Sequence, residues 1–145
     1  MKKYFIGLIL ALISCMTYAG VSIESACYQS EGVHGAGGKG RSFFFFKSYR
    51  DEDDHTYIGG FVNYNNSKLS ISVVYDSEVQ GVGGYSGDFQ RTWLEIVDRK
   101  VTGQYVEYGN YDGNPGGRYI KYTGYKDGRV VLFRISMNNS PCLGN

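Results

Sequence analysis

Residues 68–76 read KLSISVVYD, and this stretch decides the fold. Apolar side chains occupy every second position, at Leu69, Ile71, Val73 and Tyr75. Polar side chains stand on the other face at Ser70, Ser72 and Asp76. Successive side chains of a strand point to opposite faces of a sheet, so this period of two predicts a strand that is buried on one face. Half-buried strands of this kind are typical of antiparallel sheets.

The same pattern recurs along the rest of the chain. After residues 1–19 no long segment has the 3.6-residue period of an amphipathic helix, whereas short alternating segments stand between turn signals. We expect strands at residues 25–29, 42–49, 56–64, 68–76, 90–98, 100–109, 118–125 and 129–136. About seven to eight short strands joined by turns predict an all-β fold, either a small antiparallel barrel or a sandwich.

Three features mark where the strands turn or bend. Asp127-Gly128 between two alternating segments predicts a two-residue hairpin, because a type I′ turn needs positive φ at both positions. A second tight hairpin is expected around Arg99, although its residues are not the ones that such turns favour. Gly59-Gly60 interrupts the segment 56–64 and predicts a bulge or a sharp bend.

Four consecutive phenylalanines, Phe43 to Phe46, lie in one predicted strand. Neighbouring side chains of a strand point to opposite faces, so the four rings cannot all face one core. Either both faces of this strand are covered or one face binds something apolar.

Residues 1–19 have the features of an export signal. Lys2 and Lys3 form a positive start, residues 4–13 are apolar but too short to span a bilayer, and Thr17 and Ala19 allow cleavage before Gly20. We therefore expect a signal peptide at 1–19 and a single β domain at 20–145. The mature protein is expected to be periplasmic or secreted, with no transmembrane segment.

A second reading of the same signal concerns Cys15. Residues 12–15, Leu-Ile-Ser-Cys, resemble the lipobox of bacterial lipoproteins, in which the cysteine becomes lipidated at a new N-terminus. Attachment to a membrane through Cys15 therefore stays open as the alternative to a soluble exported protein. Under either reading two cysteines remain, Cys27 and Cys142, and an even pair in an exported protein predicts a disulfide. This bond would join the two ends of the domain.

Composition narrows the possible partners. The chain has 145 residues with a formal net charge of +1, and it contains neither a basic tract nor an acidic tail. Nucleic acid is therefore not expected as a partner. Two cysteines are too few for a zinc site, and no metal or other cofactor is expected.

The two unusual counts are 21 glycines and 14 tyrosines. Tyr85, Tyr108 and Tyr111 stand in or beside two Gly-rich segments, 81–88 and 110–117. Tyrosine combines a rigid apolar ring with a polar hydroxyl, which suits protein interfaces and sugar rings. We interpret these three residues as candidate binding residues, although cross-strand pairing on a sheet would also use them. The expected partner is another exported protein or a cell-envelope glycan.

Catalytic patterns are weak by comparison. Residues 51–55, Asp-Glu-Asp-Asp-His, form the densest charged cluster. Within it, Asp53, Asp54 and His55 are the residues that a small exported hydrolase would use. No G-x-S-x-G nucleophile motif is present. A G-x-G-x-x-G match at 35–40 precedes a strand instead of opening a helix, so it does not indicate dinucleotide binding.

Ser86-Gly87 begins like the Ser-Gly-x-x-Tyr loop of exported β-barrel inhibitors of lysozyme, but Gln90 stands at the tyrosine position, so the sequence assigns no family. The sequence favours an exported β binding module over an enzyme. A small hydrolase and a structural cell-envelope lipoprotein are the alternatives.

Overall fold

The structure is a computed structural model that describes residues 20–31, 43–65, 67–112, 117–136 and 142. The predicted signal peptide, Cys15 and the G-x-G-x-x-G match lie outside the described residues. The strands are β1 (Val21–Ser30), β2 (Phe43–Asp51), β3 (Tyr57–Tyr64), β4 (Ser70–Gln80), β5 (Asp88–Val97), β6 (Lys100–Asn110), β7 (Tyr119–Gly124) and β8 (Val130–Ile135). A single-turn 3₁₀ helix, η2 (Val82–Gly84), stands between β4 and β5. No helix in the described ranges is long and apolar enough to cross a membrane.

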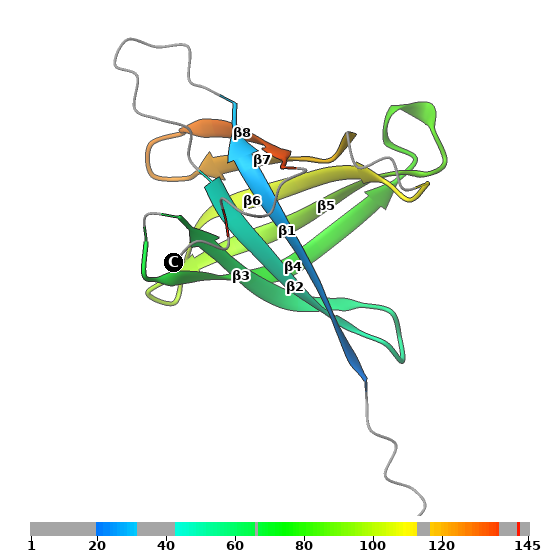
Figure 1. Cartoon of the computed structure of the whole chain (residues 1–145), viewed down its shortest axis with the longest axis horizontal. Coiled ribbons are helices and arrows are strands. Elements are labelled where there is room, and N and C mark those ends of the chain that lie inside the picture. The colour runs from blue at the N-terminus through cyan, green and yellow to red at the C-terminus, as the bar shows by residue number, and fades with distance from the viewer. Residues whose placement is uncertain (1–19, 32–42, 66, 113–116, 137–141, 143–145) are drawn as a thin grey trace, which may run out of the picture.

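The eight strands form a closed antiparallel barrel (Figure 1). Every strand pairs with the next one along the chain, and β8 pairs with β1 through Tyr28 opposite Ile135 and Ser30 opposite Phe133. The all-β prediction is confirmed, and of the two architectures that the sequence left open the structure has the barrel. Closure removes the free edges that an open sheet would expose.

The connections alternate between the two ends of the barrel. One end carries the β2–β3, β4–β5 and β6–β7 connections, which lie toward the right in Figure 1. We call this end the barrel mouth. The β3–β4, β5–β6 and β7–β8 connections lie at the opposite end.

Aromatic side chains fill the centre of the barrel. Trp93 is completely buried, and its ring makes edge-on contacts with Phe46, Tyr57 and Tyr75 at centroid distances of 5.3, 5.4 and 5.5 Å. The full buried cluster is Tyr28, Phe44, Phe46, Val62, Val73, Trp93, Tyr105, Ile120 and Phe133. An eight-stranded barrel is just wide enough for side chains to fill, so the centre is a packed core. Trp93 is therefore part of this core.

The four phenylalanines divide between the two faces of β2. Phe44 and Phe46 are buried in the barrel interior, whereas Phe43 and Phe45 are half-buried. Phe45 pairs with Cys27 on β1, and Cys27 is bonded to Cys142 with a Cα–Cα distance of 5.8 Å. The predicted disulfide is confirmed. The first expectation for this strand also holds, because both of its faces are at least partly covered.

Register shifts interrupt three of the strand pairs, and one of them lies between Glu95 and Ile96 in β5–β6. The β2–β3 register shifts between Tyr49 and Arg50, so Ile58 has no partner on β2, directly before the predicted bulge at Gly59-Gly60. The β4–β5 register shifts between Tyr75 and Ser77, a bulge that the sequence did not reveal. An extra residue in one strand changes which side chains point inward beyond it.

The two predicted hairpins have different outcomes. Asp98 and Arg99 have φ of 49° and 62° and join β5 to β6 directly, as expected. The two-residue hairpin at Asp127-Gly128 was wrong, because β7 ends at Gly124 and β8 begins at Val130. Gly128 has positive φ of 65°, but Gly124 N–H donates to the Arg129 carbonyl at 2.9 Å and closes a longer loop.

Candidate binding site at the barrel mouth

Charged side chains replace the aromatic core where the barrel approaches its mouth. Arg91 on β5 and Glu107 on β6 alternate with inward-facing aromatic residues, so they point into the barrel. Arg91 is 2% exposed and Glu107 is 1% exposed. Arg91 Nη1 lies 3.0 Å from Glu107 Oε2, and Arg118 pairs with the other carboxylate oxygen. Tyr28 Oη donates to that same oxygen at 3.2 Å.

Glu78 extends this network to the rim. Arg91 Nε donates to Glu78 Oε2 at 2.8 Å, and the Tyr111 hydroxyl and Gln80 amide donate to Glu78 Oε1. Burial alone would raise the pKa of Glu78, but the hydrogen bonds from Tyr111, Arg91 and Gln80 outweigh it and lower that pKa. The inward direction of Glu78 follows from the bulge after Tyr75.

The Arg91 guanidinium lies over the ring of Tyr57 on β3, with its Cζ atom 4.0 Å from the ring centroid. The Tyr57 hydroxyl donates to Glu24 Oε1 at 2.9 Å. Burial, which the charge of Arg91 only partly offsets, raises the pKa of Tyr57 far above 10, so its hydroxyl stays protonated. Arg91 is therefore fixed by two carboxylates and an aromatic face, and it is a structural cation.

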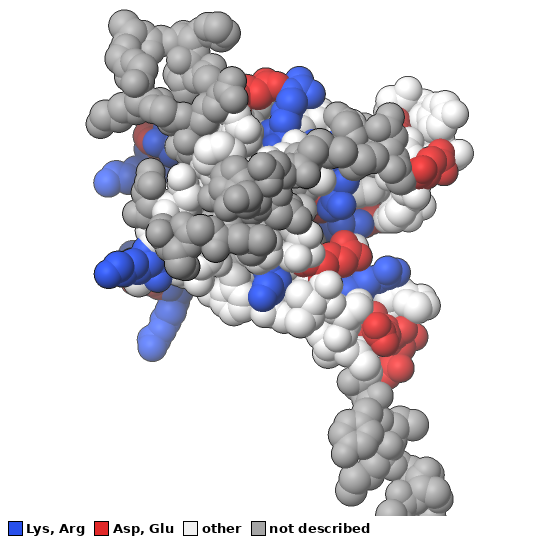
Figure 2. Space-filling model, in the orientation of Figure 1, with Lys and Arg blue, Asp and Glu red and all other residues white. Residues whose placement is uncertain are grey.

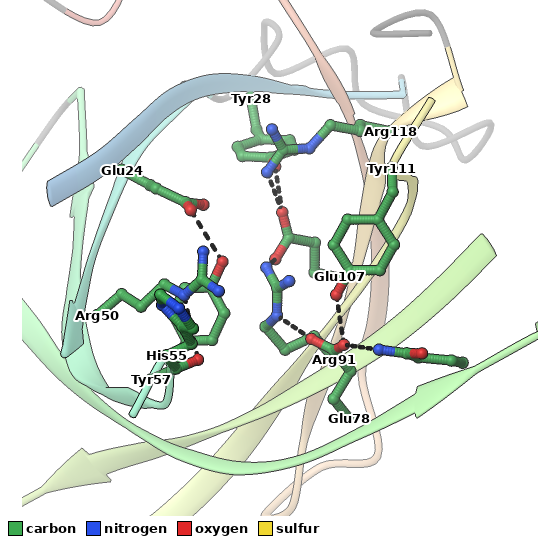
Figure 3. Close-up of polar contacts among 11 residues, drawn as sticks. Glu24, Tyr28, Arg50, His55, Tyr57, Glu78, Arg91, Glu107, Tyr111 and Arg118 are labelled. Atoms are coloured by element: carbon green, nitrogen blue, oxygen red, sulfur yellow. Dashed lines mark hydrogen bonds and ion pairs between the residues drawn. The ribbon is translucent and has the colours of Figure 1, made fainter. Parts of the chain in front are cut away.

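Arg50 on β2 differs from the other arginines of the mouth. Its Nε donates to the His55 carbonyl at 3.1 Å, and its guanidinium lies 5.6 Å from the Tyr57 ring centroid. Within the described part of the chain it forms no ion pair, whereas Arg91 and Arg118 do. Figure 3 shows Arg50 and Tyr111 on opposite sides of the mouth.

Between these two side chains the mouth is hollowed. A hollow of about 320 Å³ is lined by Arg50, His55, Thr56, Tyr57, Tyr75, Glu78, Gln80 and Tyr111. We call it the Arg50 hollow. A neighbouring hollow of about 410 Å³ reaches Glu24, Ser48, Glu107 and Arg118, where the buried Arg118 Nε has no hydrogen-bond partner within the described residues.

The structure brings two of the three predicted tyrosines to the same end. Tyr111 is 53% exposed and lines the Arg50 hollow, and Tyr85 is 62% exposed on the β4–β5 connection. Tyr111 N–H donates to the Gly87 carbonyl at 2.9 Å, and Asn110 Nδ2 donates to Asp88 Oδ1 at 2.6 Å. These contacts fasten the two Gly-rich connections to each other.

Tyr108 lies elsewhere. Its side chain is on the outer wall of the barrel, where it stacks on Tyr119 with centroids 4.5 Å apart and planes 13° apart. This is the cross-strand pairing that the sequence left open as the alternative to a binding role. A groove along the outer wall connects the pair with Val82 and Gly83 of η2.

The acidic cluster forms the β2–β3 turn. Asp51 Oδ1 accepts from Asp53 N–H at 2.8 Å, and Asp54 Oδ1 accepts from Thr56 N–H at 2.9 Å. Thr56 donates to this oxygen from its hydroxyl as well, and these two hydrogen bonds lower the pKa of Asp54, which is fully exposed. His55 has φ of 60°, and its carbonyl fixes Arg50. Asp53 and Asp54 are thus exposed turn residues, and of the proposed hydrolase residues His55 alone lines the hollow.

Charge is distributed unevenly over the surface. On the face seen in Figure 2, acidic side chains lie mainly toward the mouth, and several basic side chains project from the opposite side. A further buried carboxylate, Glu95, lies at the opposite end and accepts from Thr102, Tyr105 and Tyr122 at 2.7, 2.8 and 3.1 Å. Within the described residues the Glu95 carboxylate therefore accepts hydrogen bonds from hydroxyl groups and forms no ion pair.

Sequence reasoning did not find Arg50, Glu78, Arg91 or Glu107. The signal for Arg91 was present, because it stands in phase with Phe89 and Trp93, which both point inward. The signal for Glu78 was hidden by the bulge.

No protein-family model, curated protein or solved structure matches this chain. The functional argument therefore starts from the geometry of the mouth.

Proposed function

We propose that this protein is an exported binding module that holds its partner at the barrel mouth. The partner is another exported protein or a cell-envelope glycan. The observation that carries the proposal is the Arg50 hollow, which is open, bears three tyrosine side chains and lies beside two Gly-rich connections. Rigid aromatic side chains that end in a polar group are enriched at recognition sites.

The packing of the barrel supports a site at the mouth over one in the interior. Aromatic rings occupy the centre, so a ligand of drug size has no room inside the barrel. The ion network below the rim fixes Arg91 and Glu107, which gives the hollow a rigid floor. A rigid site lowers the entropy that binding costs.

Tyr111 and Tyr85 are the residues to test. Purified envelope glycans and exported proteins would be immobilised, and binding of the wild type would be compared with that of Tyr111→Ala and Tyr85→Ala. Tyr125→Ala is the matched control, because Tyr125 is similarly exposed, at 51%, at the opposite end of the barrel. We expect loss of binding with the two mouth variants and no change with the control. Equal binding by all three variants would exclude the mouth.

Tyr108→Ala tests a second place for the contact. Tyr108 and Tyr119 stack on the outer wall of the barrel, beside the β4–β5 connection. Loss of binding with Tyr108→Ala alone would move the contact surface from the mouth to the outer groove. Unchanged binding would leave the stack with a structural role.

The cellular location is part of the proposal. Export with cleavage before Gly20 gives a soluble protein, whereas lipidation of Cys15 gives one tethered to a membrane. Intact mass spectrometry of the mature protein from its native host distinguishes the two: we expect an N-terminus at Gly20. A mature chain that retains residues 1–19 unprocessed would contradict export.

A further inference from the structure

Arg50 is a cation of the mouth that forms no ion pair within the described residues. Its Nε is held by the His55 carbonyl, which leaves the two terminal nitrogens of the guanidinium without a hydrogen-bond partner in the described chain. The same side chain lines the Arg50 hollow. A planar guanidinium with a free edge is suited to bind a carboxylate through two parallel hydrogen bonds.

The other groups of the hollow present mainly acceptors and rings. Glu78 is already neutralised by Arg91, and its carboxylate keeps lone pairs beyond the three hydrogen bonds that it accepts. The Tyr75 hydroxyl has no hydrogen-bond partner in the described chain, and Gln80 has a free amide oxygen. A matching ligand therefore carries one anionic group and several hydroxyl donors.

The aromatic walls add a third requirement. Tyr57, Tyr75 and Tyr111 contribute to the lining, and Tyr111 is more than half exposed. Rings of this kind pack against the apolar face of a ligand while their hydroxyls keep polar partners, as Tyr57 and Tyr111 do through Glu24 and Glu78. One carboxylate, several hydroxyls and an apolar ring face together describe a sugar acid.

We propose that the Arg50 hollow binds a carboxylate-bearing sugar of an acidic glycan, with the carboxylate on Arg50 and the sugar ring against Tyr111. This inference rests on the proposed function and names the chemical class of the ligand. A peptide carboxylate would also pair with Arg50, but a peptide has few hydroxyl donors for Glu78, Gln80 and Tyr75. The acidic β2–β3 turn also disfavours polyanions of high charge density.

The test is an NMR titration of the disulfide-bonded protein, starting at Gly20, with three probes. The probes are a uronate tetrasaccharide, the neutral tetrasaccharide with the same linkage, and an Asp-rich peptide. We expect the uronate to bind at least tenfold more tightly than the other two, with shifts at the amides of Arg50 and Tyr111. A tenfold difference is the smallest that a charge-assisted pair of hydrogen bonds should give.

Variants then assign the contact. Arg50→Gln should lower uronate affinity at least tenfold. Arg50→Lys should retain part of the affinity, because lysine keeps the positive charge but cannot form two parallel hydrogen bonds to one carboxylate. Arg129→Gln, at the exposed β7–β8 connection of the opposite end, is the control and should bind like the wild type. Thermal unfolding of each variant shows that it is folded.

The outcomes separate this inference from the proposed function. Equal affinity for uronate and neutral sugar, no shift with uronate, or full binding by Arg50→Gln would overturn the sugar-acid site. Tighter binding of the Asp-rich peptide would assign the hollow to a protein partner and also overturn it. Loss of partner binding in Tyr111→Ala with none in Arg50→Gln would leave the mouth as the binding surface and refute the role of Arg50.

Discussion

Replacement of Glu107 by glutamine should destabilise this barrel strongly. Glu107 is 1% exposed and accepts hydrogen bonds from Arg91, Arg118 and Tyr28. Glutamine has the same shape, but it has no charge, and its NH₂ group would face a donor in place of one carboxylate oxygen. Arg91, itself 2% exposed, would keep only Glu78 as a counter-ion.

The size of the effect follows from this geometry. Removing one partner of a buried ion pair costs about 3–5 kcal/mol. Because Arg91 keeps Glu78 as a counter-ion, we expect Glu107→Gln to lower the free energy of unfolding by the lower limit of this range, about 3 kcal/mol. For a chain of this size the melting temperature should fall by roughly 10 °C. Urea denaturation at pH 7 measures the free energy directly, from the midpoint at an unchanged slope.

Glu31→Gln is the matched control. The same substitution there removes an ion pair with Arg134 whose two side chains are 42% and 61% exposed. Exposed pairs contribute about 0–1 kcal/mol, so this variant should unfold close to the wild type. A loss below about 1 kcal/mol for Glu107→Gln, or a loss equal to that of Glu31→Gln, would refute the reasoning that the mouth network is buried and stabilising.

Three further predictions concern the disulfide, Glu78 and Gly60. Reduction of the disulfide, which closes a separation of 115 residues, should cost about 4–5 kcal/mol in the chain-entropy account, seen as a lower melting temperature with reductant. Because the pKa of Glu78 is lowered in the folded protein, its carboxylate contributes stability above the ordinary pKa of 4.5, and this stability is lost as the pH falls through the folded-state pKa. Glu78→Gln should therefore flatten the acid side of the curve of unfolding free energy against pH. An unchanged curve would contradict this. Gly60→Ala should destabilise by about 1–3 kcal/mol, because its Cβ would overlap the backbone oxygen of Lys47, whereas Gly117→Ala meets nothing within 4 Å and should be neutral in the same denaturation assay.

The strands were predictable because their signals are local. Each of the eight expected segments overlaps a strand, and the alternation of Ile71, Val73 and Tyr75 places all three toward the interior. Leu69 followed the same pattern but is 76% exposed, because it precedes the first residue of β4. Alternation alone does not show where a strand begins.

The candidate site was predictable only in part. Tyr111 was found from its place beside a Gly-rich segment, but the same argument selected Tyr108, which stacks on the outer wall. Arg50 and Arg91 were missed because a charged residue in an alternating segment is ordinarily read as facing solvent. Arg91 lies inside the barrel and Arg50 lines its mouth, because the mouth supplies carboxylate, carbonyl and aromatic partners.

The sequence by itself determined the all-β class, the number and approximate positions of the strands and the pairing of Cys27 with Cys142. These depend on alternation, turn residues and cysteine number, which act over short distances or need no geometry. Only the tertiary structure decided that β8 closes onto β1 and that Arg50, Arg91 and Tyr111, from separate parts of the chain, meet at one mouth. The physical reason is register: a shift of one residue, such as the bulges at Ile58 and Asp76 introduce, turns every following side chain to the other face.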